Sequence, residues 1–457
     1  MTTIVAGGDV VTMNPSRDVL AGGSVVIDGD SIVAVGATTR LRTEYPGADV
    51  FDATGCVVTP GMIDAHQHLT GDGLMRCCIP DLLDSQAAIF DWSVPLHSNH
   101  DGDDDEISAT LSAVEALTNG VTTVVEAGTV AHPERVVEGM RRAGIRGTIG
   151  TWGWDVDGVP FGGTVDEVLD RQRAVIDKFP AGGIVEGWVT LVGHDLASDE
   201  LFAGAADLAR RLGTSMTMHL SPHQGDPRSY LERTGKRPVV HLHDLGVLGE
   251  QLLLGHGVWL DDTEIDLVLA TRTAIAYCPW AYLRLAQGVA ANGRHFEMYD
   301  RGGRIALGCD AVNAGDTIDI LRTAALAAGL ARDRTLDGQR FGAHQAFELA
   351  TIAGAAAIGM DGRIGSLEPG KQADLVIHRT DLPAWTPRGD IAQTLVWGTD
   401  GRSVRDVFVA GQQVIAGGRH TSIDQTELAA LAAERQAALL AKAGITLPHR
   451  WPVHDAH

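Results

Sequence analysis

Metal-binding side chains recur in this sequence at the ends of short apolar segments. Each segment reads as a buried β-strand. The side chains concerned belong to His66, His68, His219, His256 and Asp310. A (β/α)8 barrel presents its chemistry at the carboxyl ends of its strands. Imidazole and carboxylate groups around one divalent cation lower the pKa of water until hydroxide forms near neutral pH. The pattern therefore predicts a barrel that gathers these five residues into a metal site.

The middle of the chain has the alternation that a parallel sheet requires. Between residues 57 and 360, apolar segments of four to seven residues alternate with longer segments of helical periodicity. Helices are predicted at residues 104–120, 165–178 and 201–212, with strands such as 121–125 and 184–192 between them. Such alternation indicates βαβ units, and the number of repeats favours a closed barrel over an open sheet. The predicted fold class is α/β, a (β/α)8 TIM barrel with a small accessory domain.

Both ends of the chain read as short strands and turns. Residues 24–36 form a predicted hairpin with Asp28–Gly29 at its turn, and residues 373–378 and 404–415 form further strands. We expect both termini to build one small β-sandwich, followed by a helix over residues 425–442. The predicted division is residues 1–58 and 361–420 for the two parts of the sandwich, 59–360 for the barrel, and 421–457 for the terminal helix and tail.

Bulk composition excludes several function classes. The 457 residues carry a net charge of −23, which disfavours binding to nucleic acid or to an anionic membrane. There is no basic and then apolar leader, and no apolar run is long enough to span a bilayer. The five cysteines have neither metal-binding nor secreted-scaffold spacing, so we expect reduced thiols in a cytoplasmic protein. The expected partner is a small-molecule substrate.

Five motifs together resemble one known family. They are residues 58–68, 119–124, 254–256, 307–310 and 350–376. The chain is similar over nearly its whole length to the amidohydrolase superfamily, in the branch that contains cytosine deaminase, guanine deaminase and the s-triazine hydrolases. The resemblance specifies the fold and the superfamily well, and the substrate poorly. It also implies a homo-oligomer, because relatives are commonly dimers or larger.

The resemblance implies that His66, His68, His219 and Asp310 hold the metal. Three imidazoles and one carboxylate suit a single zinc ion per chain, with iron, manganese or cobalt left open. Binuclear members of the superfamily bridge two metals with a carboxylated lysine from the fourth strand. The first lysines here are Lys178, on a predicted helix, and Lys236, so that bridge is excluded. Glu126 is the remaining alternative, and otherwise supports the site from behind.

Catalytic roles follow from the same set of residues. Asp310 is expected to accept a proton from water and to pass it to the leaving group, and His256 to stabilise the developing oxyanion. The competing interpretations are a helix cap for Asp310 and a core histidine for His219. A second His-X-His pair, His241 and His243, is expected at the surface or behind the site.

The sequence departs from the deaminase pattern at two places. Deaminases of this branch carry a proton-shuttling glutamate three residues after the fifth-strand histidine, where this chain has Pro222. His223, the next residue, could protonate a leaving group instead, or it could face solvent from a loop. In the segment 277–281, tyrosine, tryptophan and alanine weaken polar recognition of a purine or pyrimidine. Three tryptophans could line a pocket or belong to the core, namely Trp92, Trp152 and Trp154.

These observations order the functional hypotheses. The first is a metal-dependent hydrolase (an amidohydrolase) that cleaves a non-peptide C–N bond in a small cyclic or heterocyclic amide, urea, carbamate or lactam. The alternative is an aminohydrolase (deaminase) or a dechlorinase of an N-heterocycle. A third hypothesis, of another class, is a metal-binding homologue that has lost hydrolysis, and a metal-dependent lyase or isomerase carries similar weight.

Overall fold

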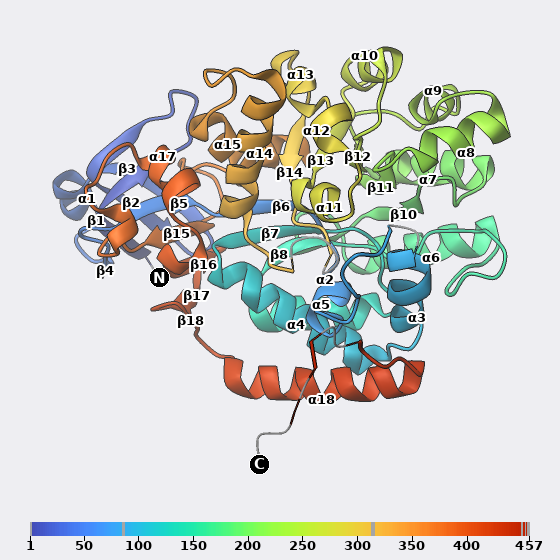
Figure 1. The fold of residues 1–457 in the computed structure, drawn as a ribbon. Coiled ribbons are helices and arrows are strands. Elements are labelled where there is room, and N and C mark those ends of the chain that lie inside the picture. Colours follow the sequence, from blue (N-terminus) through green and yellow to red (C-terminus); the bar gives the residue numbers. More distant parts are fainter. Residues whose placement is uncertain (1, 85–86, 312–315, 449–450, 453, 455–457) are drawn as a thin grey trace.

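The computed structural model describes residues 2–84, 87–311, 316–448, 451–452 and 454. Strands from both ends of the chain form one nine-stranded sheet, in the order β18-β17-β16-β15-β5-β1-β2-β3, with β4 paired to β1 (Figure 1). The strands of this sheet are β1 Thr2–Val11, β2 Val19–Asp28, β3 Ser31–Ala37, β4 Asp49–Asp52, β5 Val57–Pro60, β15 Leu375–His378, β16 Val404–Val409, β17 Gln412–Ala416 and β18 Arg419–His420. The prediction that both termini build one β unit is confirmed.

The terminal unit is joined edge to edge rather than face to face. Strand β5 pairs in parallel with β1 and antiparallel with β15, so one strand links the two halves into a continuous sheet. A sandwich of two separate sheets was expected, and this central pairing is why a single sheet results. The hairpin of β2 and β3 is confirmed, with Asp28 opposite Ser31 at its turn.

Nine strands in the middle of the described chain form two parallel sheets. Their orders are β6-β7-β8-β9 and β10-β11-β12-β13-β14. The strands are β6 Met62–Gln67, β7 Val121–Glu126, β8 Arg146–Ile149, β9 Val185–Gly187, β10 Val189–Gly193, β11 Met216–Leu220, β12 Leu252–His256, β13 Ala274–Tyr277 and β14 Ile305–Leu307.

The two parallel sheets meet at both of their edges. Only Trp188 separates β9 from β10, and its N–H donates to the carbonyl of Ile149 in β8. On the other side, the N–H of Asp310 beyond β14 donates to the carbonyl of His66 in β6 at 2.9 Å. The predicted α/β class is confirmed. Strand pairing does not run continuously around the described ring, so the predicted closed barrel is seen as two sheets.

Helices cover these strands, and their ends follow from local sequence. The predicted helix 165–178 is confirmed as α6, because Thr164 and Glu167 form a reciprocal cap at its start. Helix α7 ends where Gly213 adopts a left-handed conformation. The helices are α1 Thr38–Glu44, α2 Leu69–Gly73, α3 Val94–His97, α4 Gly102–Thr118, α5 Pro133–Ala143, α6 Val165–Lys178, α7 Asp199–Leu212, α8 Gly225–Thr234, α9 Pro238–Asp244, α10 Asp262–Ala270, α11 Pro279–Arg284, α12 Val289–Asn292, α13 His295–Asp300, α14 Ile320–Thr335, α15 Ala343–Ala350, α16 Ile352–Ala357, α17 Ile391–Gln393 and α18 Gln425–Ala443.

Helix α18 lies against α4, remote in sequence, along one side of the molecule (Figure 1). Arg435 pairs with Asp101 and Asp104 at the start of α4, each at 2.7 Å. Leu439 is buried in an apolar cluster with Leu74. Among the described residues, no helix has the length and apolar character needed to cross a membrane. The predicted domain boundaries stay a prediction.

Candidate metal centre and active site

Four histidines and one aspartate converge where the parallel strands end. His66 lies in β6 and His68 just beyond it, while His219 and His256 lie in β11 and β12. Parallel strands that share a sheet direct their carboxyl ends to the same side. The His66 ring centroid is 5.2 Å from that of His68, 4.8 Å from that of His219 and 5.0 Å from that of His256. The structure thus brings together the residues predicted from sequence.

The free ligand atoms of these residues point at one another. Nε2 of His68 and Nε2 of His219 are 3.2 Å apart. Asp310 Oδ1 is 3.4 Å from His68 Nε2 and 3.8 Å from His66 Nε2. One ligand atom from each of His66, His68 and His219 lies within 4.8 Å of the others. Within the described chain, both nitrogens of His66 are buried without a hydrogen-bond partner. Buried polar atoms normally have partners, so this arrangement fits a divalent cation.

Neighbouring groups fix which nitrogen each histidine offers. The Nδ1–H of His219 donates to the carbonyl of Val192 at 2.7 Å, and Nδ1 of His68 lies 2.8 Å from the hydroxyl of Thr129. Both contacts occupy Nδ1 and leave Nε2 as the lone pair that faces the cluster. Such partners are what orient metal-ligating imidazoles.

The charges of the cluster also suit a cation. Burial holds the pKa values of His66, His219 and His256 well below the ordinary value, so these rings are neutral. Burial alone would raise the pKa of Asp310, but the His68 ring, whose Nε2 lies 3.4 Å from Oδ1, and the nearby His66 and His256 rings hold it well below its usual range. Burial would lower the pKa of His68, but Asp310 outweighs it and raises that pKa, so a cation bound here would compete with a proton on His68.

Backbone strain accompanies two of these residues. His256 has φ of 87° and Asp310 has φ of 63°, a left-handed conformation that side chains other than glycine rarely adopt. Such residues cost on the order of 1–3 kcal/mol each and gather at functional sites. Both strained residues belong to the cluster of potential ligand atoms.

Cys278 was not predicted as part of the cluster. One ligand atom from each of His66, His256, Cys278 and Asp310 also lies within 4.8 Å of the others. Burial raises the pKa of the Cys278 thiol well above its usual value, so the sulfur stays protonated without a metal. Its position was a signal that sequence reasoning could have used. Cys278 directly follows strand β13, and Asp310 likewise lies shortly after the end of β14.

His194 is the second residue that sequence reasoning missed. It directly follows β10, and its Nδ1–H donates to Asp226 Oδ2 at 2.9 Å. The His194 ring stacks on that of His219, with centroids 5.5 Å apart. Burial would lower the pKa of His194, but Asp226 outweighs it and raises that pKa. A histidine and aspartate pair therefore lies beside the cluster and lines the same cavity as Pro222.

His223 lies in the same cavity, as predicted for the active-site alternative. Its ring is parallel to that of His194, with centroids 6.4 Å apart. Nδ1 of His223 accepts a hydrogen bond from the N–H of Gly225 at 2.9 Å, so Nε2 is the nitrogen that can carry a proton. Burial lowers the pKa of His223. Its catalytic role stays a prediction.

Other residues raised from the sequence lie outside the cluster. Glu126 accepts hydrogen bonds from the N–H groups of Leu69 and Gly128, so its two oxygens hold the backbone behind the site. His241 is buried in α9 and pairs with Asp199 at 2.8 Å. Tyr277 is buried against His295, with ring centroids 4.2 Å apart.

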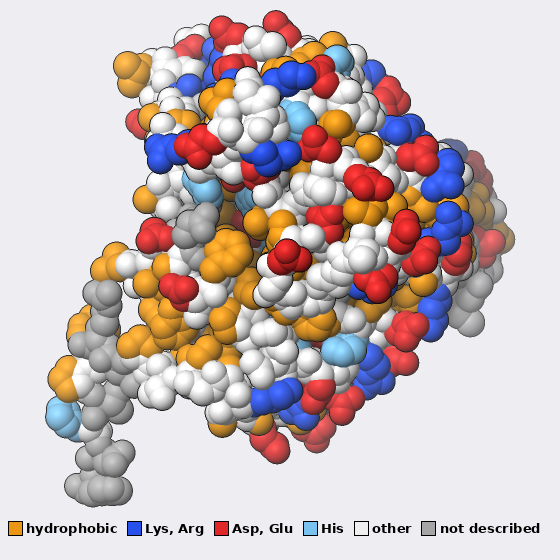
Figure 2. All heavy atoms as spheres, turned by 90° about the vertical axis from the view of Figure 1, so that its right-hand side faces the viewer, with side chains coloured by type: hydrophobic (Ala, Val, Ile, Leu, Met, Phe, Trp, Pro, Cys, Tyr) orange, Lys and Arg blue, Asp and Glu red, His pale blue; other side chains and the backbone are white. Residues whose placement is uncertain are grey.

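A cavity of about 290 Å³ opens from the cluster toward solvent. Trp152 and Trp154 line it, which confirms the pocket alternative for these two tryptophans. Figure 2 shows this side of the molecule, where hydrophobic side chains surround a hollow that contains histidine atoms.

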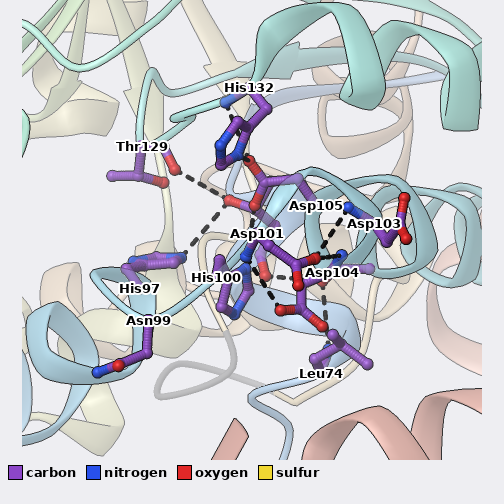
Figure 3. Close-up of polar contacts among 12 residues, drawn as sticks. Leu74, His97, Asn99, His100, Asp101, Asp103, Asp104, Asp105, Thr129 and His132 are labelled. Carbon is purple, nitrogen blue, oxygen red and sulfur yellow. Dashed lines mark hydrogen bonds and ion pairs between the residues drawn. The ribbon is translucent and has the colours of Figure 1, made fainter. Parts of the chain in front are cut away.

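His97, at the end of α3, also lines the cavity. Behind it, Asp105 accepts hydrogen bonds from His100 at 3.0 Å and from His132 at 2.9 Å (Figure 3).

Comparison with known proteins supports the geometry. Residues 57–414 match the model of the amidohydrolase family. The chain is 27% identical to the 5-methylthioadenosine/S-adenosylhomocysteine deaminase of Thermodesulfovibrio yellowstonii, covering 93% of this chain and 96% of the relative. It is 28% identical to the deaminase of the same name from Halobacterium salinarum, covering 97% and 99%.

Solved structures show the same fold. A zinc-bound adenosine deaminase from Xanthomonas campestris superposes with a TM-score of 0.91 at 23% identity, covering 96% of this chain and 98% of the other. An atrazine chlorohydrolase from Arthrobacter aurescens, complexed with zinc, superposes with a TM-score of 0.84 at 24% identity, covering 96% and 100%.

Proposed function

The chain belongs to the amidohydrolase family, and from that premise we propose that it is a metal-dependent aminohydrolase of an amino-substituted N-heterocycle. The observation that carries the proposal is the buried convergence of His66, His68, His219 and Asp310 at the base of an open cavity. Relatives named as deaminases of adenine-containing compounds match over more than nine-tenths of the chain, which favours deamination over the amide-type hydrolysis expected first.

One divalent cation per chain, with zinc as the first candidate, would be held by His66, His68, His219 and Asp310. Such a cation lowers the pKa of water and so supplies a nucleophile at neutral pH. Asp310 is ionised and buried, so it accepts the proton that the attacking water loses. His256 lies across the cluster and stabilises the oxygen of the reacting carbon. A C–O bond forms, the C–N bond breaks, and ammonia leaves with the transferred proton.

Proton delivery to the ring must bypass Pro222. In our proposal His194 does this, because Asp226 holds its Nδ1–H and leaves Nε2 to carry a proton in the cavity. His223 lies behind His194 and serves as the second proton carrier. The two histidines replace one glutamate as the general acid.

A second candidate function is hydrolysis of an amide, urea or carbamate C–N bond. Pro222 favours it, because such substrates need no protonation of a ring nitrogen. The two candidates share the same metal cluster and differ in the bond that breaks.

A substrate panel tests the proposal. Zinc-loaded protein is incubated with aminopurines, aminopyrimidines, aminotriazines and matched amides, ureas and carbamates, and ammonia and products are measured. We expect ammonia from an amino-heterocycle, and a loss of at least about a hundredfold in kcat for Asp310→Asn. The exposed variant His243→Gln is the control and should keep full activity. Turnover of amides alone would support the second candidate, and no turnover would support a binding homologue.

A further inference from the structure

The cavity has an aromatic and aliphatic wall away from the metal cluster. Trp152 and Trp154 stack with ring centroids 4.8 Å apart, and Phe161 stacks on Trp152 at 5.8 Å. The indole N–H of Trp154 donates to the carbonyl of Pro160 at 2.8 Å, which fixes this ring. The apolar side chains of Met75 and Phe90 line the same cavity. An apolar substituent gains affinity here because rings and methyl groups replace its water shell.

Away from the metal cluster and the His194–Asp226 pair, the described lining of the cavity has no cationic side chain. Among its described lining residues there is no lysine or arginine, whereas Asp195, Asp226 and Asp310 all line it. Asp195 is engaged by Ser229 and Arg233, and Asp226 by His194. A carboxylate or phosphate in this space would lose water, meet carboxylates and find no cation in exchange.

The histidine beside the aromatic wall does not supply positive charge either. His97 contacts the edge of Trp152, with ring centroids 5.7 Å apart, and packs edge-on against His100 at 5.4 Å. Burial lowers the pKa of His97 to about 3, so its imidazole is neutral. Asp105, which lies behind His97, is already bonded to His100 and His132 (Figure 3). His97 therefore offers a neutral hydrogen-bonding edge within an apolar wall.

We propose that this wall selects uncharged heterocycles that carry an apolar arm, aryl or alkyl, and rejects arms that carry a carboxylate or phosphate. Trp152 and Phe90 are the specificity-determining residues of this selection. The inference rests on the proposed function, since it assumes that the heterocycle occupies the cluster end of the cavity and that the arm extends toward Trp152.

Binding of unreactive probes tests the selection independently of turnover. The probes are purine, 9-benzylpurine and 9-(4-carboxybenzyl)purine, titrated calorimetrically into zinc-loaded protein. We expect 9-benzylpurine to bind at least about tenfold more tightly than either of the other two. Trp152→Ala should bring 9-benzylpurine within about threefold of purine and leave the affinity for purine unchanged.

A gain-of-function variant keeps the test decisive if Trp152→Ala does not fold. Phe90 is 38% exposed, so Phe90→Lys places a cation at the cavity rim without burying it. We expect it to improve binding of the carboxybenzyl probe by about threefold and to weaken that of 9-benzylpurine. Leu431→Lys adds the same charge at a site of matched exposure, 40%, on α18, and should change neither.

The outcomes separate the inference from the proposed function. Carboxybenzyl binding as tight as benzyl binding in the wild type would overturn the inference, as would an unchanged ratio in Phe90→Lys or no binding of any probe. If 9-benzylpurine shows the expected preference but 9-benzyladenine releases no ammonia, the selection holds and the proposed function fails. If 9-benzyladenine and 9-(4-carboxybenzyl)adenine are deaminated equally fast, the proposed function holds and the selection fails.

Discussion

At the scale of single residues, metal binding depends on imidazole lone pairs that no other protein atom occupies. His68 and His219 each use Nδ1 for a neighbour and present Nε2 to the cluster, and His66 has both nitrogens buried without a partner in the described chain. Sequence motifs predicted all of these ligands. They did not single out Cys278 or His194, although each directly follows a strand, because the ends of β13 and β10 are fixed by pairing with strands distant in sequence.

Thr129 offers a sharp test of metal binding. Its hydroxyl contacts Nδ1 of His68, so Thr129→Val removes the orienting partner while keeping the shape of the side chain. We expect zinc affinity to fall by about tenfold, measured by competition with a chelator. Thr123→Val is the matched control, because the Thr123 hydroxyl is buried without a described partner. An unchanged affinity in Thr129→Val would contradict the assigned orientation.

The His194–Asp226 pair predicts a pH dependence of stability. Asp226 raises the pKa of His194, so this pair stabilises the fold fully below the pKa of the unfolded histidine. That stabilisation is lost as the pH rises through the higher folded pKa. Asp226→Asn should therefore lower the Tm of metal-free protein more at pH 6 than at pH 9. Exposed Asp157→Asn should show no such difference, and a larger effect at pH 9 would reverse the assignment.

At the scale of elements, local signals were reliable where caps and glycines were strong. Helix α6 has the predicted bounds because of its reciprocal cap, whereas α8, α9 and α11–α13 begin without a side-chain cap. The predicted strand 184–192 is interrupted at Trp188, whose N–H bonds to β8 instead. Such exchanges between neighbouring strands depend on residues distant in sequence, so periodicity alone could not predict them.

Gly193 links an element boundary to the metal cluster. It has φ of 78°, and a Cβ there would lie 2.1 Å from the carbonyl oxygen of His219. Gly193→Ala should cost about 3 kcal/mol of folding free energy and should also weaken zinc binding, because the strand that carries His219 must move. Gly213→Ala has a similar φ of 64° with open space around it, and should cost only about 1 kcal/mol. Equal effects on both Tm and zinc content would contradict this account.

At the scale of the whole molecule, segments remote in sequence support the cavity. Helix α18 lies on α4, whose start carries Asp105 behind the cavity wall, and the terminal sheet ties both chain ends together (Figure 1). The sequence predicted that the terminal strands would form one unit and that a helix would follow. It contained no pattern for where that helix would dock, because docking depends on surface shape.

Two leucines of α18 test how this helix packs on the rest of the molecule. Leu439 is 2% exposed in the apolar cluster with Leu74, whereas Leu431 on the same helix is 40% exposed. Leu439→Ala should cost about 3 kcal/mol of folding free energy, and Leu431→Ala less than about 0.5 kcal/mol. Denaturant unfolding of both variants gives the comparison, and similar costs would place the helix elsewhere.

The central claim is that water replaces an amino group at the His66, His68, His219 and Asp310 cluster. The most direct measurement is mass spectrometry of the product formed by zinc-loaded protein from an aminopurine in ¹⁸O-labelled water. We expect one labelled oxygen on the ring carbon that lost ammonia, and at least about a hundredfold slower product formation by Asp310→Asn. A product without the label, or a label found only on hydrolysed amides, would contradict it.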